Sequence, residues 1–214
     1  MTRFLVVLDV DSTLIENEVI ELLAEEAGTE AAAAVAATTF RAMNGEIDFE
    51  ESLRHRVRSL AGLPVSVFET VASRITVTDG VPELIAGVHA AGGLVGVVSG
   101  GFHEILDPIA ARLGLDSWRA NRLEVADGRL TGQVTPPVID AAAKAATLIE
   151  WAEEAGIPLR QTVAVGDGAN DLPMMAISGL SVAFDAKAPV RERADVVLDE
   201  RDLSQVLPLL GLPR

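Results

Sequence analysis

The sequence contains no cysteine, which excludes disulfide bonds, thiolate catalysis and cysteine-ligated zinc or iron–sulfur sites. Aromatic residues make up only 4% of the 214 residues, against 49% hydrophobic residues, so the core must be aliphatic. No segment approaches the ~20 apolar residues of a membrane span, and the apolar run near the N-terminus is too short for a signal peptide. We therefore expect a cytoplasmic protein that does not act on a membrane.

Positive charge is also scarce. The chain has 17 Lys and Arg residues against 32 Asp and Glu residues, a net charge of −15. This imbalance opposes binding to nucleic acid or to an anionic membrane surface. A phosphate group recognised by this chain must therefore be attracted locally, by a metal ion or by a few cations. The length fits one domain, or one domain with a modest insertion.

Short aliphatic runs alternate with stretches that have helical spacing. The runs span residues 4–8, 94–98, 162–165 and 180–184, with a weaker one at 196–198. The helical stretches include residues 81–91, 105–113 and 142–155. Aliphatic runs of this length need burial on both faces, as in a parallel sheet. The pattern predicts an α/β fold, a Rossmann-like parallel sheet with helices on both faces.

The region after the first aliphatic run is different. Between Ser12 and about Thr76 we find only helical stretches, at residues 16–27, 30–43, 49–60 and 65–73. This pattern predicts a helical cap domain, residues 13–76, inserted after the first strand of a core formed by residues 1–12 and 77–214. Farther along, Asp127-Gly128 separates two alternating segments, which predicts a small β-hairpin.

Aspartates follow two of the predicted strands directly. Asp9 and Asp11 come after the first run, and Asp167 and Asp171 come after the third. Residues i and i+2 of a strand point the same way, and ligands of open α/β sheets bind at the carboxyl ends of the strands. A plainer interpretation is that these residues form only turns and helix caps. Because a carboxylate at a buried edge needs a partner, two such pairs indicate a cation between them.

A serine, two glycines and a lysine complete the predicted site. The second run ends in Ser99-Gly100-Gly101, where small residues let backbone N–H groups approach an anion, although this segment alone could be an ordinary tight turn. Lys144 is the only cation within residues 130–159, and taken alone it could be a solvated helix lysine. Four such features at one sheet edge are, however, poorly explained by four unrelated structural roles.

Phosphoryl transfer accounts for the whole set. Mg²⁺ prefers hard oxygen ligands, and the carboxylates of Asp9 and Asp167 with a backbone oxygen of Asp11 can supply them. A free oxygen of Asp9 can attack phosphorus and form an aspartyl-phosphate intermediate. Asp11 can protonate the leaving alcohol and then deprotonate the attacking water. Ser99 and Lys144 can bind the non-bridging phosphoryl oxygens.

These motifs resemble those of a known superfamily. Asp9-Val-Asp-Ser-Thr, Ser99-Gly-Gly, Lys144 and Gly166-Asp-Gly-Ala-Asn-Asp171 are similar, in order and spacing, to the four motifs of the haloacid dehalogenase superfamily. The paired Asp-x-Asp implies a phosphatase. Further segments resemble the phosphoserine phosphatase family: Glu16-Asn-Glu18, Met43-Asn-Gly45, Phe49-Glu-Glu-Ser-Leu-Arg-His-Arg56-Val and Ala120-Asn-Arg-Leu.

The resemblance implies an activity and a substrate site. The activity is Mg²⁺-dependent hydrolysis of O-phospho-L-serine to L-serine and phosphate, the final step of serine biosynthesis. In the cap, Glu18 would meet the substrate ammonium and Arg56 its carboxylate, while Met43 and Phe49 would close over the ligand. In the core, the resemblance implies that Gly100 and Gly101 join Ser99 in binding substrate, that Asn170 helps to position it, and that Asp171 supports the metal ligands.

Several alternatives stay open at this level. The same chemistry would serve a phosphotransferase that passes phosphate from phosphoserine to homoserine, or a phosphatase for another small phosphomonoester. Product analysis with added homoserine separates these, because only a transferase forms phosphohomoserine. A non-catalytic phosphate-binding member of the fold is a third hypothesis. The sequence also leaves open whether Mn²⁺ or Co²⁺ serves as the metal, and whether the protein is a monomer or a homodimer.

Overall fold

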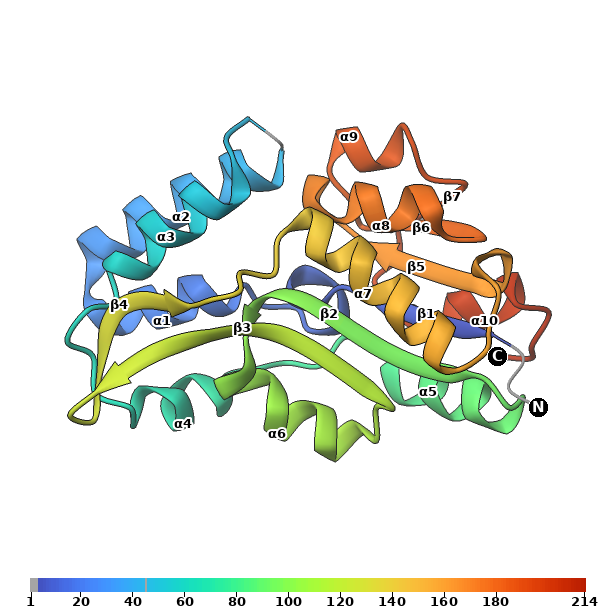
Figure 1. Cartoon of the computed structure of the whole chain (residues 1–214), viewed down its shortest axis with the longest axis horizontal. Coiled ribbons are helices and arrows are strands. Elements are labelled where there is room, and N and C mark those ends of the chain that lie inside the picture. Colours follow the sequence, from blue (N-terminus) through green and yellow to red (C-terminus); the bar gives the residue numbers. More distant parts are fainter. Residues whose placement is uncertain (1–3, 45) are drawn as a thin grey trace.

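The predicted parallel sheet is confirmed. The computed structural model describes residues 4–44 and 46–214. Its sheet has seven strands in the order β4-β3-β2-β1-β5-β6-β7 (Figure 1). All neighbouring strands are parallel except β3 and β4, which form an antiparallel hairpin. The strands are β1 (Leu5–Leu8), β2 (Leu94–Phe102), β3 (Ser117–Ala126), β4 (Arg129–Thr135), β5 (Thr162–Gly166), β6 (Leu180–Phe184) and β7 (Val196–Leu198).

The helices follow the predicted spacing closely. Those of the predicted insertion are α1 (Val19–Ala27), α2 (Thr29–Met43), α3 (Phe49–Arg58) and α4 (Val67–Ala72). The others are α5 (Val81–Ala90), α6 (His103–Leu113), α7 (Ala141–Glu154), α8 (Leu172–Ile177), α9 (Ala188–Arg191) and α10 (Val206–Leu209). Side-chain caps fix two of the starts, because Asp48 accepts the N–H of Glu51 and Asp140 accepts the N–H of Ala143.

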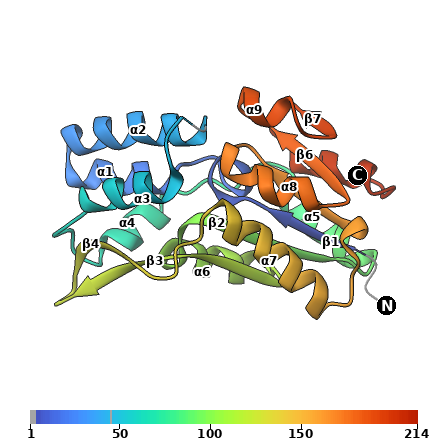
Figure 2. The same cartoon turned by 45° about the horizontal axis from the view of Figure 1, so that its top comes forward.

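Both faces of the sheet are covered, as the aliphatic runs require. Leu5 and Val7 of β1 belong to a buried cluster with residues of α7, α8 and α9. Val6 and Leu8 alternate with them and belong to a second cluster, with residues of α5, α6 and α10. Successive side chains of a strand point to opposite faces, so one strand anchors both layers. Figure 2 shows these layers from a second direction.

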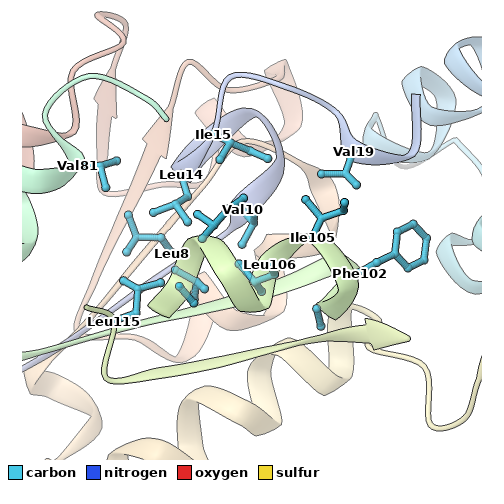
Figure 3. Close-up of a cluster of buried hydrophobic side chains, with 14 of the residues drawn as sticks. Leu8, Val10, Leu14, Ile15, Val19, Val81, Phe102, Ile105, Leu106 and Leu115 are labelled. Carbon is cyan, nitrogen blue, oxygen red and sulfur yellow. The ribbon is translucent and has the colours of Figure 1, made fainter. Parts of the chain in front are cut away.

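A hydrophobic cluster holds the segment that follows β1. This segment, Val10–Leu14, forms an irregular helical turn in which Asp11 and Ser12 depart from helical backbone angles. Val10 and Leu14 are buried, and they lie with Ile105 and other side chains of α6 in one cluster (Figure 3). Packing therefore fixes the backbone that carries the two N-terminal aspartates.

The first strand of the predicted hairpin, β3, is also a strand of the main sheet. The first part of β3 pairs with β2 as a strand of the main sheet, which the prediction missed because Ser-Trp-Arg-Ala-Asn-Arg has no aliphatic run. The distal part lies beside the helices of the insertion at one end of the molecule (Figures 1 and 2). There the N–H of Gly62 donates to the carbonyl of Leu130 at 2.8 Å, and the N–H of Leu130 donates to that of Leu63 at 2.9 Å.

Two boundaries also differ from prediction. Strand β2 continues past residue 98 to Phe102, so Ser99-Gly100-Gly101 lies within an irregular strand end. Helix α1 begins at Val19 rather than near residue 16, which leaves Glu18 at the helix start. Within residues 4–44 and 46–214, none of the helices has both the length and the apolar character that crossing a membrane demands.

The core makes a testable contribution to stability. Leu84 of α5 is fully buried, and it is not among the predicted site residues. We expect Leu84→Ala to lower the free energy of unfolding by about 2–5 kcal/mol, because it removes apolar contacts and leaves a cavity. Urea unfolding measures this loss. The control Val125→Ala, at a residue that is 43% exposed, should change stability by no more than about 0.5 kcal/mol.

Candidate active site

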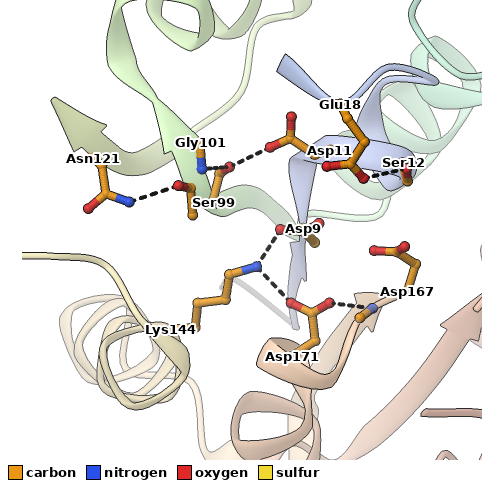
Figure 4. Close-up of polar contacts among 12 residues, drawn as sticks. Asp9, Asp11, Ser12, Glu18, Ser99, Gly101, Asn121, Lys144, Asp167 and Asp171 are labelled. Atoms are coloured by element: carbon orange, nitrogen blue, oxygen red, sulfur yellow. Dashed lines mark hydrogen bonds and ion pairs between the residues drawn. The ribbon is translucent and has the colours of Figure 1, made fainter. Parts of the chain in front are cut away.

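The central strands bring the predicted polar residues to one edge. β2, β1 and β5 are adjacent in the sheet, so Ser99, Asp9 and Asp167 emerge side by side at its carboxyl end (Figure 4). The N–H of Asp9 donates to the carbonyl of Val165 at 2.9 Å, which continues the ladder between β1 and β5. The fold thus gathers side chains that are far apart in the sequence.

Lys144 lies between two carboxylates. Its side chain is fully buried, and its Nζ donates to Oδ1 of Asp171 at 2.7 Å and to Oδ1 of Asp9. Burial lowers the pKa of Lys144, but the two carboxylates outweigh burial and raise that pKa above its ordinary value. Lys144 therefore stays charged, and it is not the solvated helix lysine of the plainer interpretation.

Both carboxylate oxygens of Asp171 accept a hydrogen bond, the first of them from Lys144. Its second carboxylate oxygen accepts the N–H of Gly168 at 3.1 Å. A Cβ at position 166 would overlap the Asp171 side chain, so a glycine is needed where the chain leaves β5. Since both oxygens of Asp171 already have partners, the geometry favours a supporting role for this residue.

Three carboxylates form a group with the composition of a metal site. Asp9, Asp167 and Asp171 each offer an oxygen, and these oxygens lie within 4.8 Å of one another. All three side chains are buried, where unbalanced negative charge is costly. A donor set made only of oxygen fits a hard divalent cation. The carboxylate of Asp11 is outside this group, because it faces Ser99 and the start of α1.

Lys187 is a cation that the sequence analysis missed. It follows β6 at the same edge of the sheet, and its Nζ bonds Oδ2 of Asp167. Burial raises the pKa of Asp167 to about 6, although Lys187 opposes this shift. The position of Lys187 after a predicted strand is the signal that could have identified it.

Asp11 has the environment of a proton carrier. Its Oδ1 accepts the N–H of Val19 at 2.7 Å, and its Oδ2 accepts the hydroxyl of Ser99 at 3.1 Å. Burial raises the pKa of Asp11, and these two hydrogen bonds only partly oppose the shift. A carboxyl group with a raised pKa can donate a proton closer to neutral pH.

The Ser99-Gly100-Gly101 segment is packed too closely for larger residues. A Cβ at Gly101 would lie 2.8 Å from Oδ2 of Asp11, and one at Gly100 would overlap the ring of Phe49. The N–H of Gly101 donates to Oγ of Ser99 at 2.7 Å. Asn121, part of a motif given no role from the sequence, donates to the carbonyl of Gly100 at 2.8 Å (Figure 4).

Glu18 and Arg56 face the same cavity, from the start of α1 and from α3. Burial raises the pKa of Glu18 well above its ordinary value, whereas burial lowers that of Arg56. Each side chain makes a hydrogen bond to a hydroxyl group. The hydroxyl of Ser12 donates to Oε1 of Glu18 at 2.7 Å, and Nη1 of Arg56 donates to Oγ1 of Thr39 at 3.0 Å. These two residues are therefore not ordinary solvated helix charges.

The cavity itself gathers most of the predicted residues. It is lined by Asp9, Asp11, Glu18, Phe49, Arg56, Gly100, Gly101 and Asn170, together with Ile20 and Leu53. Ile20 and Leu53 were not predicted from the sequence, although each lies within three residues of a predicted contact. Oδ1 of Asn170 is buried and has no hydrogen-bond partner among the described residues. The side chain of Met43 lies outside the part of the chain that the structure describes.

Comparison with known proteins identifies the class. The family model of haloacid dehalogenase-like hydrolases matches residues 6–176, a range that begins within β1 and ends within α8. The protein therefore belongs to this hydrolase family, as its sheet and its strand-end aspartates indicated.

Relatives within the family are similar over nearly the whole chain. A phosphoserine phosphatase of Streptococcus thermophilus is 50% identical over 206 residues, covering 96% of this chain and 95% of that protein. One of Streptomyces coelicolor is 52% identical, but this chain spans only 51% of its length. This chain also spans only about half, 52%, of the length of a phosphoserine phosphatase of Mycobacterium tuberculosis. A solved phospho-aspartyl intermediate analogue of phosphoserine phosphatase superposes with a TM-score of 0.94 at 44% identity, covering 98% and 99% of the two chains.

The raised pKa of Asp167 predicts a pH effect on the metal-free protein. Between its ordinary 3.8 and about 6, the folded state binds more protons at this residue than the unfolded state does. The free energy of unfolding should therefore fall as pH rises through this range, by up to about 1.4 kcal/mol per pH unit. Urea unfolding in EDTA at several pH values measures the slope. Asp167→Asn should show a shallower slope, and an equal slope would contradict the assignment.

Proposed function

We propose that this protein is a phosphoserine phosphatase, which hydrolyses O-phospho-L-serine to L-serine and phosphate in the final step of serine biosynthesis. One observation carries the proposal. A single cavity is lined by the paired aspartates Asp9 and Asp11 and by a carboxylate and a guanidinium, those of Glu18 and Arg56. This arrangement matches a phosphate ester whose other end is a zwitterion. The phosphoserine phosphatases among its relatives support the same substrate.

The substrate's amino acid end would be bound by the cap. Glu18 meets the ammonium group, and Arg56 binds the carboxylate through two parallel hydrogen bonds. The ring of Phe49, whose centroid lies 6.0 Å from Cζ of Arg56, would close over the ligand. Asn170, whose buried side-chain oxygen has no hydrogen-bond partner among the described residues, positions the substrate from the core side.

The first half-reaction forms a covalent intermediate. An oxygen of Asp9 attacks phosphorus, a new Asp9–phosphate bond forms, and the ester bond to the serine oxygen breaks. Asp11 gives its proton to that oxygen, so serine leaves as a neutral alcohol. The hydroxyl of Ser99, the N–H of Gly100 and the ammonium of Lys144 hold the phosphoryl oxygens, and the N–H of Gly101 holds Oγ of Ser99 in place.

The second half-reaction restores the enzyme. Asp11, now ionised, takes a proton from water as the water oxygen attacks phosphorus. The bond between phosphorus and Asp9 breaks, and phosphate is released. Asp11 is again protonated for the next cycle, so its raised pKa serves both halves.

The acidic group at the sheet edge would hold Mg²⁺. The carboxylates of Asp9 and Asp167 and the backbone oxygen of Asp11 would be ligands, with Asp171 supporting them. When bound, the ion supplies positive charge that neutralises the phosphoryl oxygens. The oxygen-only donor set of the described residues supports this choice of a hard cation.

The remaining roles follow from the arrangement of the chain. Residues 13–76 would act as a lid that excludes water from the core formed by residues 1–12 and 77–214. We place the protein in the cytoplasm, as a monomer or homodimer acting on a small molecule. Its net charge of −15 supports the absence of nucleic acid and membrane partners.

Replacing Arg56 tests the substrate. We expect Arg56→Ala to lower kcat/KM for phosphoserine roughly 100-fold, because a charge-assisted carboxylate contact is lost. Turnover of p-nitrophenyl phosphate, which has no carboxylate, should change far less. Steady-state phosphate release measures both, and an equal loss on the two substrates would refute the role of Arg56.

Replacing Asp9 tests the chemistry. Asp9→Asn keeps the size of the side chain but removes the nucleophile, so phosphate release should fall by on the order of 10³-fold or more on every substrate. EDTA should abolish release by the unmodified protein, and added Mg²⁺ should restore it. The matched control is Asp199→Asn at an exposed surface ion pair, which should leave the rate unchanged. Full activity of Asp9→Asn or in EDTA would contradict the mechanism.

A further inference from the structure

Two hydroxyl groups outside the predicted site contact the charged pair of the cavity. Ser12 donates to Oε1 of Glu18 at 2.7 Å, as Figure 4 shows. Thr39 accepts from Nη1 of Arg56 at 3.0 Å. Ser12 lies in the turn after β1, whereas Thr39 lies on α2. Each hydroxyl therefore contacts one member of the pair, from a different element.

The backbone of Ser12 is held in an unusual conformation. Its φ is +59°, in the left-handed region that residues other than glycine seldom adopt. The N–H of Ser12 donates to the carbonyl of Asn17 at 3.2 Å, and Nη2 of Arg201 donates to the carbonyl of Ser12 at 3.3 Å. Strain of this kind persists only where surrounding contacts fix it. These contacts hold the backbone at Ser12, from which the hydroxyl reaches Oε1 of Glu18, so that Oε2 of Glu18 can accept from a ligand.

Thr39 holds Arg56 in a similar way. Both residues are only 3% exposed, so water does not replace their hydrogen bond. Nε of Arg56 donates to the carbonyl of Ser52 at 3.3 Å. With Nε and one N–H of Nη1 engaged, the remaining N–H groups, one on Nη1 and two on Nη2, can face a carboxylate. Because Thr39 is β-branched and helical, its side chain has few rotamers in which to place the hydroxyl.

We infer that Ser12 and Thr39 are positioning residues that divide substrate specificity between them: Ser12 orients Glu18 for the ammonium group, and Thr39 orients Arg56 for the carboxylate. The inference rests on the proposed function. A charged group that is already oriented loses less freedom when the ligand binds, so each hydroxyl strengthens recognition of one end of the substrate.

The test uses two analogues that each lack one charged group. O-Phosphoethanolamine has the amine without the carboxylate, and 3-phosphooxypropanoate has the carboxylate without the amine. The readout is the ratio of kcat/KM for the first analogue to kcat/KM for the second. Ser12→Ala should lower this ratio roughly tenfold, and Thr39→Val, which keeps the shape of the side chain, should raise it roughly tenfold.

Further variants separate the hydroxyl from other effects. Ser12→Gly removes the hydroxyl without the cost of a positive φ, so it should lower the ratio as Ser12→Ala does. Thr39→Ser keeps a hydroxyl and should return the ratio toward that of the unmodified protein. Ser73→Ala removes an exposed serine hydroxyl elsewhere in the predicted cap and should leave the ratio unchanged. Urea unfolding of each variant confirms that it is folded.

Opposite shifts of the ratio would support the inference. A purely structural role would reduce turnover of both analogues alike, so an unchanged ratio in folded Ser12→Gly and Thr39→Val would overturn it. The proposed function has a separate test in the unmodified protein. If that protein prefers phosphoserine to both analogues and the ratio does not shift, only the inference fails. If it shows no such preference, the proposed function fails with it.

Discussion

The buried lysine between two aspartates is the interaction on which the site depends. Adjacent central strands of a parallel sheet deliver carboxylates to one edge, where burial makes their ionised forms costly. Lys144 bonds Asp9 and Asp171 and supplies charge where water is excluded. Removing one partner of such a group leaves a buried charge unpaired, which costs several kcal/mol. Stability and the proposed chemistry therefore depend on the same contacts.

The cavity joins the phosphate end of the site to the end that would bind the amino acid. The turn after β1 carries Asp11 and Ser12, and each makes a hydrogen bond to a residue at the start of α1. Side chains of the insertion and of the sheet also share one continuous hydrophobic cluster. The segments that carry Glu18 and Arg56 are thus tied to the strand that carries Asp9. Binding of the amino acid end of the substrate can therefore be coupled to placement of its phosphate group through these direct contacts.

Much of the fold could be predicted because its signals are local. Aliphatic runs and helical spacing located β1, β5, β6 and the longer helices, and Asp127-Gly128 located the hairpin. β3 was missed as a sheet strand because its polar sequence lacks such a run. Lys187 and Thr39 were missed because no neighbouring residues in the sequence reveal their contacts. Each resembles an ordinary helix or loop residue until folding places it beside Asp167 or Arg56.

The sequence by itself determined the α/β class, the edge at which the aspartates gather, and the family, because strand periodicity and strand-end motifs are encoded over a few neighbouring residues. Only the tertiary structure decided which groups meet. The contact of Lys144 with Asp9 spans 135 residues, and that of Arg56 with Thr39 spans 17. Burial, which sets the direction of many of the pKa shifts in the site, is likewise a property of the packed chain. No local pattern can specify it, because it depends on segments that are distant in the sequence.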